Sequence, residues 1–122
     1  MSVYGDAIHE HSRHPRNYGS LDAPDIRGEE FNPLCGDRVR IELNVDAHGV
    51  VSAARFQGDL CIIAKAAGSI LTEMITGRTL ADIESLTDAA MLEAMQAEIR
   101  PARVQCALLA LMALRKGIAD QK

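Results

Sequence analysis

The segment 38–45 constrains the fold more than any other part of the chain. Within it, Val39, Ile41, Leu43 and Val45 alternate with polar side chains. A period of two places the apolar side chains on one face of a β-strand and the polar side chains on the opposite face. The chain is therefore expected to build a sheet with one buried face, which helices from other segments have to cover.

This strand is expected to belong to a small antiparallel sheet. Residues 46–49 have the turn sequence Asp-Ala-His-Gly, and residues 50–56 have the composition of a returning strand. A turn between two such runs predicts an antiparallel hairpin. Residues 29–34 are expected to add a third, shorter strand to the sheet.

Two long segments carry apolar residues at helical spacing. The first runs from Cys61 to residue 76, where Gly77 ends it, and the second follows Pro101 and is apolar over much of its circumference. We expect the first of these helices to pack on the sheet. The second helix is expected to be the most buried helix of the protein.

Shorter helices complete the prediction. An N-terminal helix is expected over residues 3–13, and it ends before Pro15. Thr79 and Thr87 are expected to cap two surface helices, the second of which runs over residues 88–98. Together, these elements predict an α+β fold in which about five helices pack against a small three-stranded antiparallel sheet.

Length, charge and cysteine content narrow the class of protein. The 122 residues suffice for one core, so residues 1–122 are expected to form a single domain. A net charge of −4 argues against a general nucleic-acid binder, and no apolar run approaches the roughly 20 residues that span a membrane. The charged N-terminus is unlike a signal peptide, and an odd number of cysteines favours the reducing cytosol. We therefore expect a cytoplasmic protein without nucleic-acid or membrane partners.

The cysteines carry the chemistry that the sequence suggests. In Cys35-Gly36-Asp37, the glycine lets the backbone bend so that the thiol and the carboxylate can converge on one ion. Cys61 and Cys106 lie far along the chain, unlike the closely spaced ligand pairs of zinc fingers, so the fold itself has to bring the ligands together. Thiolates with one carboxylate suit zinc, or iron with inorganic sulfide.

Cys61 and Cys106 are expected near helix starts, where the helix dipole favours a thiolate and lowers the pKa of the thiol. Either is therefore a candidate to accept sulfur as a persulfide. A single cysteine is more often a small buried apolar residue, but these cysteines lie at element boundaries, where sites are usually built. A Cys-His hydrolase is not favoured, because all four histidines fall in predicted surface segments of the first half.

Several motifs occur in an order that is known from one protein family. They are Tyr4-x3-Ile8-x2-His11, His14-Pro15-Arg16-Asn17, Asn32-Pro33-x-Cys35-Gly36-Asp37, Phe56-x-Gly58-x2-Cys61 and Arg100-Pro101-Ala102-Arg103-Val104-Gln105-Cys106. By their order and spacing, the chain resembles the NifU/IscU/SufU family of iron-sulfur cluster assembly scaffold proteins over nearly its whole length. The Pro-x-Arg-x2-Cys form of the last motif is closest to the SufU-like branch, although this chain lacks the longer segment that the branch carries.

The resemblance implies an IscU/SufE-like fold and a scaffold that is not an enzyme. It implies that Cys35, Asp37, Cys61 and Cys106 hold a transient [2Fe-2S] cluster, or zinc in the same site. It also implies two kinds of partner, a cysteine desulfurase that supplies sulfur and recipient apo-proteins that take the cluster. Because the Leu-Pro-Pro-Val-Lys motif is absent and Gln105 replaces the histidine of the IscU branch, an Hsp70-type chaperone is not expected as a partner.

Two other functions stay open. One is a zinc-containing sulfur acceptor that activates a cysteine desulfurase. The other is a metal-free adaptor that has kept the fold, because Leu60 stands where the family usually has glycine and Lys65 stands where it is usually apolar.

The charge of a loaded site leads to a further expectation. Zinc bound by three thiolates and Asp37 leaves a formal charge of about −2. We expect Arg38, Arg103 or Lys65 to offset part of this charge.

Overall fold

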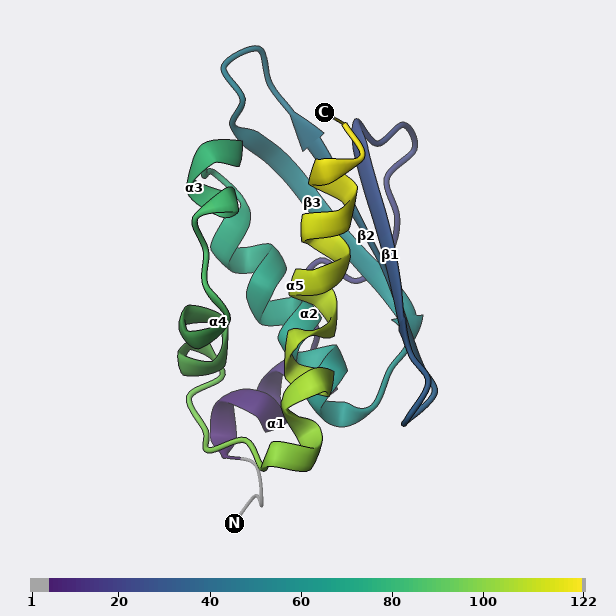
Figure 1. The fold of residues 1–122 in the computed structure, drawn as a ribbon. Coiled ribbons are helices and arrows are strands. Elements are labelled where there is room, and N and C mark those ends of the chain that lie inside the picture. The colour runs from purple at the N-terminus through teal and green to yellow at the C-terminus, as the bar shows by residue number, and fades with distance from the viewer. Residues whose placement is uncertain (1–4, 122) are drawn as a thin grey trace.

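The computed structural model describes residues 5–121 and has an α+β fold. Helices α2 and α5 lie against one face of the sheet, and α1, α3 and α4 lie on the far side of these two helices (Figure 1). The elements are α1 (Asp6–Arg13), β1 (Ile26–Asn32), β2 (Asp37–Val45), β3 (Val51–Asp59), α2 (Ile62–Ile75), α3 (Leu80–Glu84), α4 (Asp88–Ala94), the 3-10 turn η1 (Pro101–Arg103) and α5 (Val104–Ala119).

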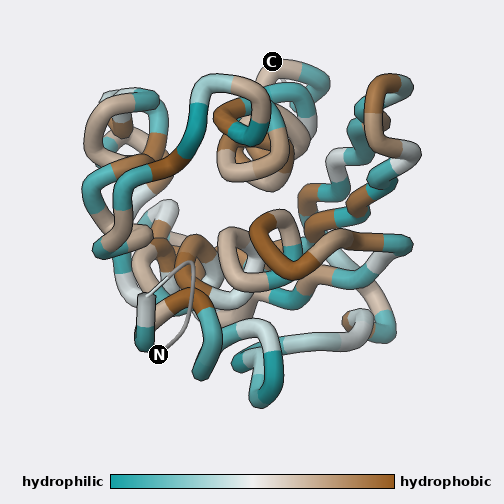
Figure 2. Tube along the Cα trace, turned by 90° about the horizontal axis from the view of Figure 1, so that it is seen from below, coloured by the Kyte–Doolittle hydropathy of each residue, from teal (hydrophilic) through white to brown (hydrophobic). Residues whose placement is uncertain are grey.

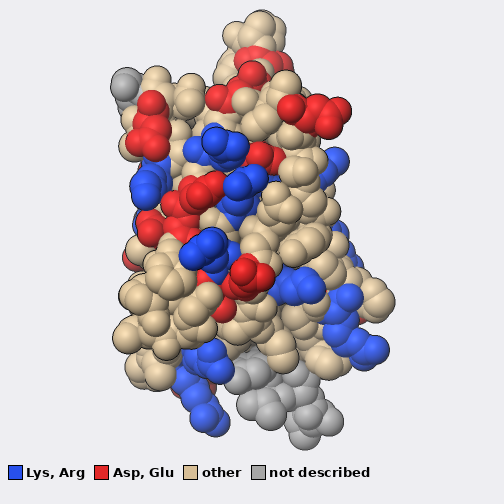
Figure 3. Space-filling view, turned by 90° about the vertical axis from the view of Figure 1, so that its right-hand side faces the viewer, with Lys and Arg blue, Asp and Glu red and all other residues tan. Residues whose placement is uncertain are grey.

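The predicted three-stranded antiparallel sheet is confirmed, with the strand order β1-β2-β3. Val39, Ile41 and Leu43 of the central strand are each at most 1% exposed, as the alternation predicts. The opposite face carries basic and acidic side chains that are intermixed rather than gathered by sign (Figure 3). Apart from Glu42, which is 4% exposed, the sheet therefore has one face in the core and one face in water.

Strands β1 and β3 are longer than expected. Strand β1 begins at Ile26, which is 4% exposed, rather than at residue 29, and it ends at Asn32 rather than at residue 34. The early part of β1 was missed because Gly28 weakens the strand pattern, yet this glycine lets α5 approach: a Cβ there would collide with the backbone oxygen of Ala113. Strand β3 continues past residue 56 to Asp59, which places its end two residues before Cys61.

Apolar segments of the helices and of the sheet face a common interior (Figure 2). Helix α5 was expected to be the most buried helix, and this expectation is wrong. Ten of the 14 residues of α2 are buried, against ten of the 16 residues of α5. Helix α2 is more completely enclosed because α1 packs on the side that faces away from α5 and the sheet.

Both threonine caps are confirmed. Thr79 accepts a hydrogen bond from the Asp82 backbone N–H, and Thr87 accepts one from the Ala90 N–H. Helix α4 ends at Ala94 instead of residue 98, because Gln96 adopts a left-handed conformation with φ of 54°. As expected for surface helices, α3 and α4 each bury a single residue of their own span.

The N-terminal helix is confirmed from Asp6 to Arg13, while its expected start at residue 3 and the motif residue Tyr4 lie outside the described residues. Ile8 is fully buried and anchors the helix. His11 was expected to be solvated, but its Nδ1 lies 2.7 Å from the hydroxyl of the buried Ser69. No helix among residues 5–121 is both long enough and apolar enough to cross a membrane.

Candidate metal centre

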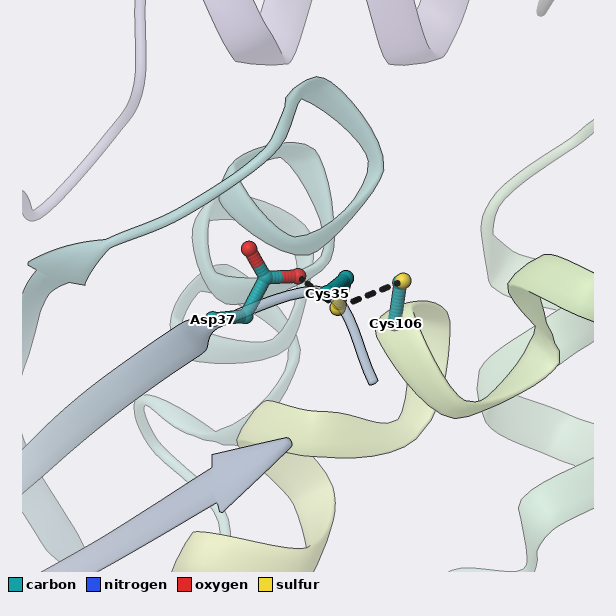
Figure 4. Close-up of side chains that lie close together, drawn as sticks. All are labelled: Cys35, Asp37 and Cys106. Atoms are coloured by element: carbon teal, nitrogen blue, oxygen red, sulfur yellow. Dashed lines mark hydrogen bonds between the residues drawn. The ribbon is translucent and has the colours of Figure 1, made fainter. Parts of the chain in front are cut away.

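Four elements meet at the lower end of the molecule and deliver the predicted ligands (Figures 1 and 4). Cys35 lies in the turn between β1 and β2, where Gly36 has a φ of 75° that suits glycine. Asp37 is the first residue of β2, and Cys61 caps the N-terminus of α2. Cys106 lies in the first turn of α5. Every predicted ligand therefore sits at the beginning of an element or in a turn.

Three of the four predicted ligands form a compact group. The Cys35 sulfur lies 3.1 Å from Oδ2 of Asp37 and 3.5 Å from the Cys106 sulfur (Figure 4). The ligand atoms of all three residues lie within 4.8 Å of one another. Tetrahedral sulfur ligands bonded at about 2.3 Å to zinc stand roughly 3.8 Å apart, so the spacing of these atoms fits a single ion.

Cys61 adjoins this group without belonging to it. Its backbone N–H donates a 2.9 Å hydrogen bond to Oδ1 of Asp37, and its sulfur accepts a hydrogen bond from the Ala64 N–H at 3.4 Å. Asp37 and Cys106 are nevertheless close enough to influence the pKa of the Cys61 thiol. The Cys61 sulfur therefore lies beside the group, near two of its three members.

Asp37 stays ionised although it is only 4% exposed. Burial acts to raise the pKa of its carboxyl group, but hydrogen bonds from Cys35 and Cys61 outweigh burial and hold the pKa below its ordinary value. The contact between Asp37 and the backbone of Cys61 was not predicted. The position of an acidic residue at a strand start beside a helix N-terminus is the signal that could have found it.

The expectation of lowered thiol pKa values at the helix starts is wrong. Burial raises the pKa of Cys61, even though the Ala64 N–H favours its thiolate, and the carboxylate of Asp37 raises it further. Burial also raises the pKa of Cys106 to about 12, together with a hydrogen bond involving Cys35. Desolvation therefore exceeds the helix-terminus effect at both positions. A bound cation would reverse this balance, because metals bind the thiolate form.

One of the three cations expected near the site contacts a ligand. Nη1 of Arg103 lies 3.9 Å from the Cys106 sulfur. Lys65 instead places its ammonium 5.3 Å from the centre of the Tyr18 ring, and Arg38 lies 5.4 Å from the centre of the Phe31 ring. Both of these cations are thus held on aromatic faces.

The surroundings of the site are open and partly apolar. Leu34 is 90% exposed, and Ile62 is 54% exposed. Of the cysteine residues, Cys35 is exposed, Cys61 is half-buried and Cys106 is only 2% exposed. A cavity of about 280 Å³ beside the cysteines is lined by Cys61, Ile62, Ile63 and Arg103.

The residues that depart from the family pattern do not block the site. Leu60 is half-buried and packs against the core, while Gln105 is exposed. The ammonium of Lys65 is occupied by Tyr18, as noted above, so it does not introduce an unpaired buried charge among the ligands. The donor atoms that the structure brings together therefore retain the chemistry of a soft and borderline metal site.

Comparisons with known proteins agree with this geometry. Residues 3–122 match the NifU-like N terminal domain. The chain is 34% identical over 123 residues to the iron-sulfur cluster assembly scaffold protein IscU of Azotobacter vinelandii. This alignment covers 98% of this chain and 94% of that protein. It is 32% identical over 138 aligned positions to the zinc-dependent sulfurtransferase SufU of Bacillus subtilis, covering 99% of this chain and 92% of that protein.

The second alignment is longer than this chain, so the Bacillus relative has residues that this chain lacks. The fold agrees with solved structures as well. It superposes on a putative iron-sulfur cluster assembly scaffold protein of the SUF system from Fervidobacterium islandicum with a TM-score of 0.79, 21% identity and coverage of 95% and 96% of the two chains. Together, the matched domain, the full-length relatives and the arrangement of Cys35, Asp37 and Cys106 show that the chain belongs to the family of NifU-like N-terminal domains.

Proposed function

We propose that the protein is a scaffold for iron-sulfur cluster assembly, which receives sulfur from a cysteine desulfurase and passes a [2Fe-2S] cluster to recipient apo-proteins. The observation that carries this proposal is the group of Cys35, Asp37 and Cys106, whose ligand atoms lie within 4.8 Å of one another. Cys61 completes the set of four ligands. The IscU relatives, which are named as assembly scaffolds, support this function.

The ligand set suits a cargo that has to leave again. Carboxylate oxygen is a harder ligand than thiolate and binds iron less durably in a sulfur-rich site. Cys35 and the apolar Leu34 lie at the surface, so that a recipient protein reaches one edge of the site directly.

Sulfur transfer to this protein requires an accessible thiolate. Attack by the thiolate on the outer sulfur of the donor persulfide forms a new S–S bond and breaks the donor S–S bond. The donor cysteine leaves as a thiolate with the electron pair, and the proton of the hydropersulfide stays on the transferred sulfur. Of the two acceptors expected from the sequence, Cys61 is the accessible one, since Cys106 is 2% exposed. Exposure adds Cys35 as a further candidate.

Anaerobic reconstitution tests the scaffold function. The purified protein is incubated with ferrous iron, sulfide and thiol reductant, and visible charge-transfer absorption is recorded. We expect a chromophore in the wild-type protein that is lost in Cys35→Ala, with Ser52→Ala, an exposed position of β3, as the matched control. Absence of the chromophore from the wild-type protein would contradict the scaffold function.

The second candidate function is a zinc-containing sulfur acceptor that activates a cysteine desulfurase. The spacing of the Cys35, Asp37 and Cys106 ligand atoms also fits one zinc ion, and the Bacillus relative is named as a zinc-dependent sulfurtransferase. Stoichiometric zinc together with stimulation of a desulfurase, but without a chromophore after reconstitution, would favour this function. In both functions, the protein is expected to act in the cytoplasm and to carry a persulfide only transiently.

A further inference from the structure

A loaded site carries excess negative charge, and two of its ligands are buried away from water. Three thiolates and one carboxylate contribute four negative charges, of which a zinc ion or a [2Fe-2S] core neutralises about two. Asp37 is 4% exposed and Cys106 is 2% exposed. Charge in such surroundings is costly unless a partner of opposite sign lies close to it.

The three cations that lie near the site have different partners. Lys65 and Arg38 rest on the rings of Tyr18 and Phe31, at 5.3 and 5.4 Å from the ring centres. Arg103 alone among these three contacts a sulfur, with Nη1 at 3.9 Å from the Cys106 sulfur. Arg103 also lines the cavity of about 280 Å³ that Cys61 lines.

The backbone holds Arg103 in this place. Pro101 occupies the first position of η1, and the Arg103 N–H donates a 2.8 Å hydrogen bond to the Arg100 carbonyl. Arg103 precedes Cys106 by three residues, which is a spacing that brings side chains together on one helical face. The guanidinium is therefore presented to the Cys106 sulfur by a rigid turn rather than by a freely moving loop.

We propose that Arg103 is a positioning residue that retains the metal or cluster, by pairing its guanidinium with the sulfur of Cys106 in the loaded site. This inference rests on the proposed function, because it assigns the charge partner of the same ligand set. Arg103 binds no metal itself. It stabilises a thiolate that does, in the way that outer partners of metal ligands usually contribute.

Zinc release from matched variants tests this assignment. Arg103→Gln, Arg103→Lys, Arg38→Gln and Lys65→Gln are loaded with Zn²⁺, and dissociation is followed with a chromophoric chelator in excess. We expect Arg103→Gln to release zinc about 10–100-fold faster than the wild-type protein, and Arg103→Lys to restore part of the difference. Arg38→Gln and Lys65→Gln, which remove the same charge from aromatic partners, are expected to release zinc at the wild-type rate.

Two further measurements distinguish a charge partner from a merely structural residue. The thermal midpoint of metal-free Arg103→Gln is expected to match that of the metal-free wild-type protein, and the visible spectrum of its Co²⁺ form is expected to show unchanged tetrahedral ligation. A wild-type rate of zinc release in Arg103→Gln, equal acceleration in all three Gln variants, or a large loss of metal-free stability would overturn the inference. Failure of the wild-type protein to bind zinc or iron would instead overturn the proposed function.

Discussion

At the scale of single residues, Asp37 connects two parts of the site. Its Oδ2 accepts a hydrogen bond from the Cys35 sulfur, and its Oδ1 accepts one from the backbone of Cys61. The side chain thereby connects the turn before β2 with the start of α2. Its pKa is held below the ordinary value, so the carboxylate is available to a cation at neutral pH.

Replacement of this carboxylate should weaken metal binding. In Asp37→Asn, the amide keeps the shape of the side chain but removes the anionic oxygen ligand. We expect zinc affinity, measured by competition with a chelator, to fall by more than about 10-fold. Asp59→Asn is the matched control, because it removes an exposed carboxylate from the end of β3. An equal loss in both variants would mean that overall charge, and not ligation, sets the affinity.

At the scale of elements, the contact between β1 and α5 places Cys106 in the site. Gly28 of β1 and Gly117 of α5 let the two backbones approach closely, since a Cβ on Gly117 would lie 3.0 Å from backbone atoms of Arg27 and Gly28. Helix α5 thus packs directly on the edge strand β1. Its first turn then reaches the β1–β2 turn that carries Cys35.

A methyl group at Gly28 should separate these elements. We expect Gly28→Ala to lower the free energy of unfolding by about 1–3 kcal/mol, because its Cβ collides with the Ala113 carbonyl. Urea unfolding followed by circular dichroism measures this loss. Ser52→Ala, at an exposed position of β3, is the control for a substitution within a strand. Unchanged stability in Gly28→Ala would contradict the prediction and show that α5 can shift away from β1 without cost.

The contact between α1 and α2 should depend on pH. Burial and then the charge of Arg16 lower the pKa of His11, while Glu73 and Glu10 oppose the shift. Because the folded-state pKa lies below the ordinary value of 6.5, the unfolded chain binds more protons as the pH falls through 6.5. The contribution of this group to stability therefore decreases as the pH falls through that range.

Urea unfolding midpoints measured at pH values from about 5 to 8, where histidine titrates, test this dependence. We expect the urea midpoint of His11→Gln to decrease less at acid pH than the midpoint of the wild-type protein does. His48→Gln, at an exposed position after β2, is expected to keep the wild-type slope. A wild-type slope in His11→Gln would contradict the assignment.

At the scale of the whole molecule, the site ties together segments that lie far apart in the sequence. Cys35, Cys61 and Cys106 come from the β1–β2 turn, the start of α2 and the start of α5. An ion that binds all of them is bound by the folded chain and not by the unfolded one. Metal binding and folding are therefore linked.

Added zinc should raise the stability of the folded protein. At a free concentration of 100 times the Kd, we expect a gain of about 2.7 kcal/mol in the free energy of unfolding. Differential scanning calorimetry at several zinc concentrations measures the gain. In Cys106→Ser, the dependence on zinc should be much weaker, and an undiminished dependence would place the zinc elsewhere.

The sequence allows most elements to be predicted, because their signals are local. Alternation around Ile41 and caps at Thr79 and Thr87 each depend on neighbouring residues alone. The motif pattern also names the site residues. The buried contact of His11 could not be predicted, because it depends on how α1 docks on α2. The pKa values of Cys61 and Cys106 were misjudged for the same reason, since desolvation arises only from tertiary packing.

The last helix of the chain has a consequence for biosynthesis. Because Cys106 belongs to α5, a chain emerging from the ribosome presents Cys35, Asp37 and Cys61 before the final ligand is available. Contacts distant in sequence form late, once the residues that join them have left the exit tunnel. We therefore expect a nascent chain, or a truncated translation product that ends before α5, to bind metal less tightly than the finished protein, because it lacks one of the three grouped ligands.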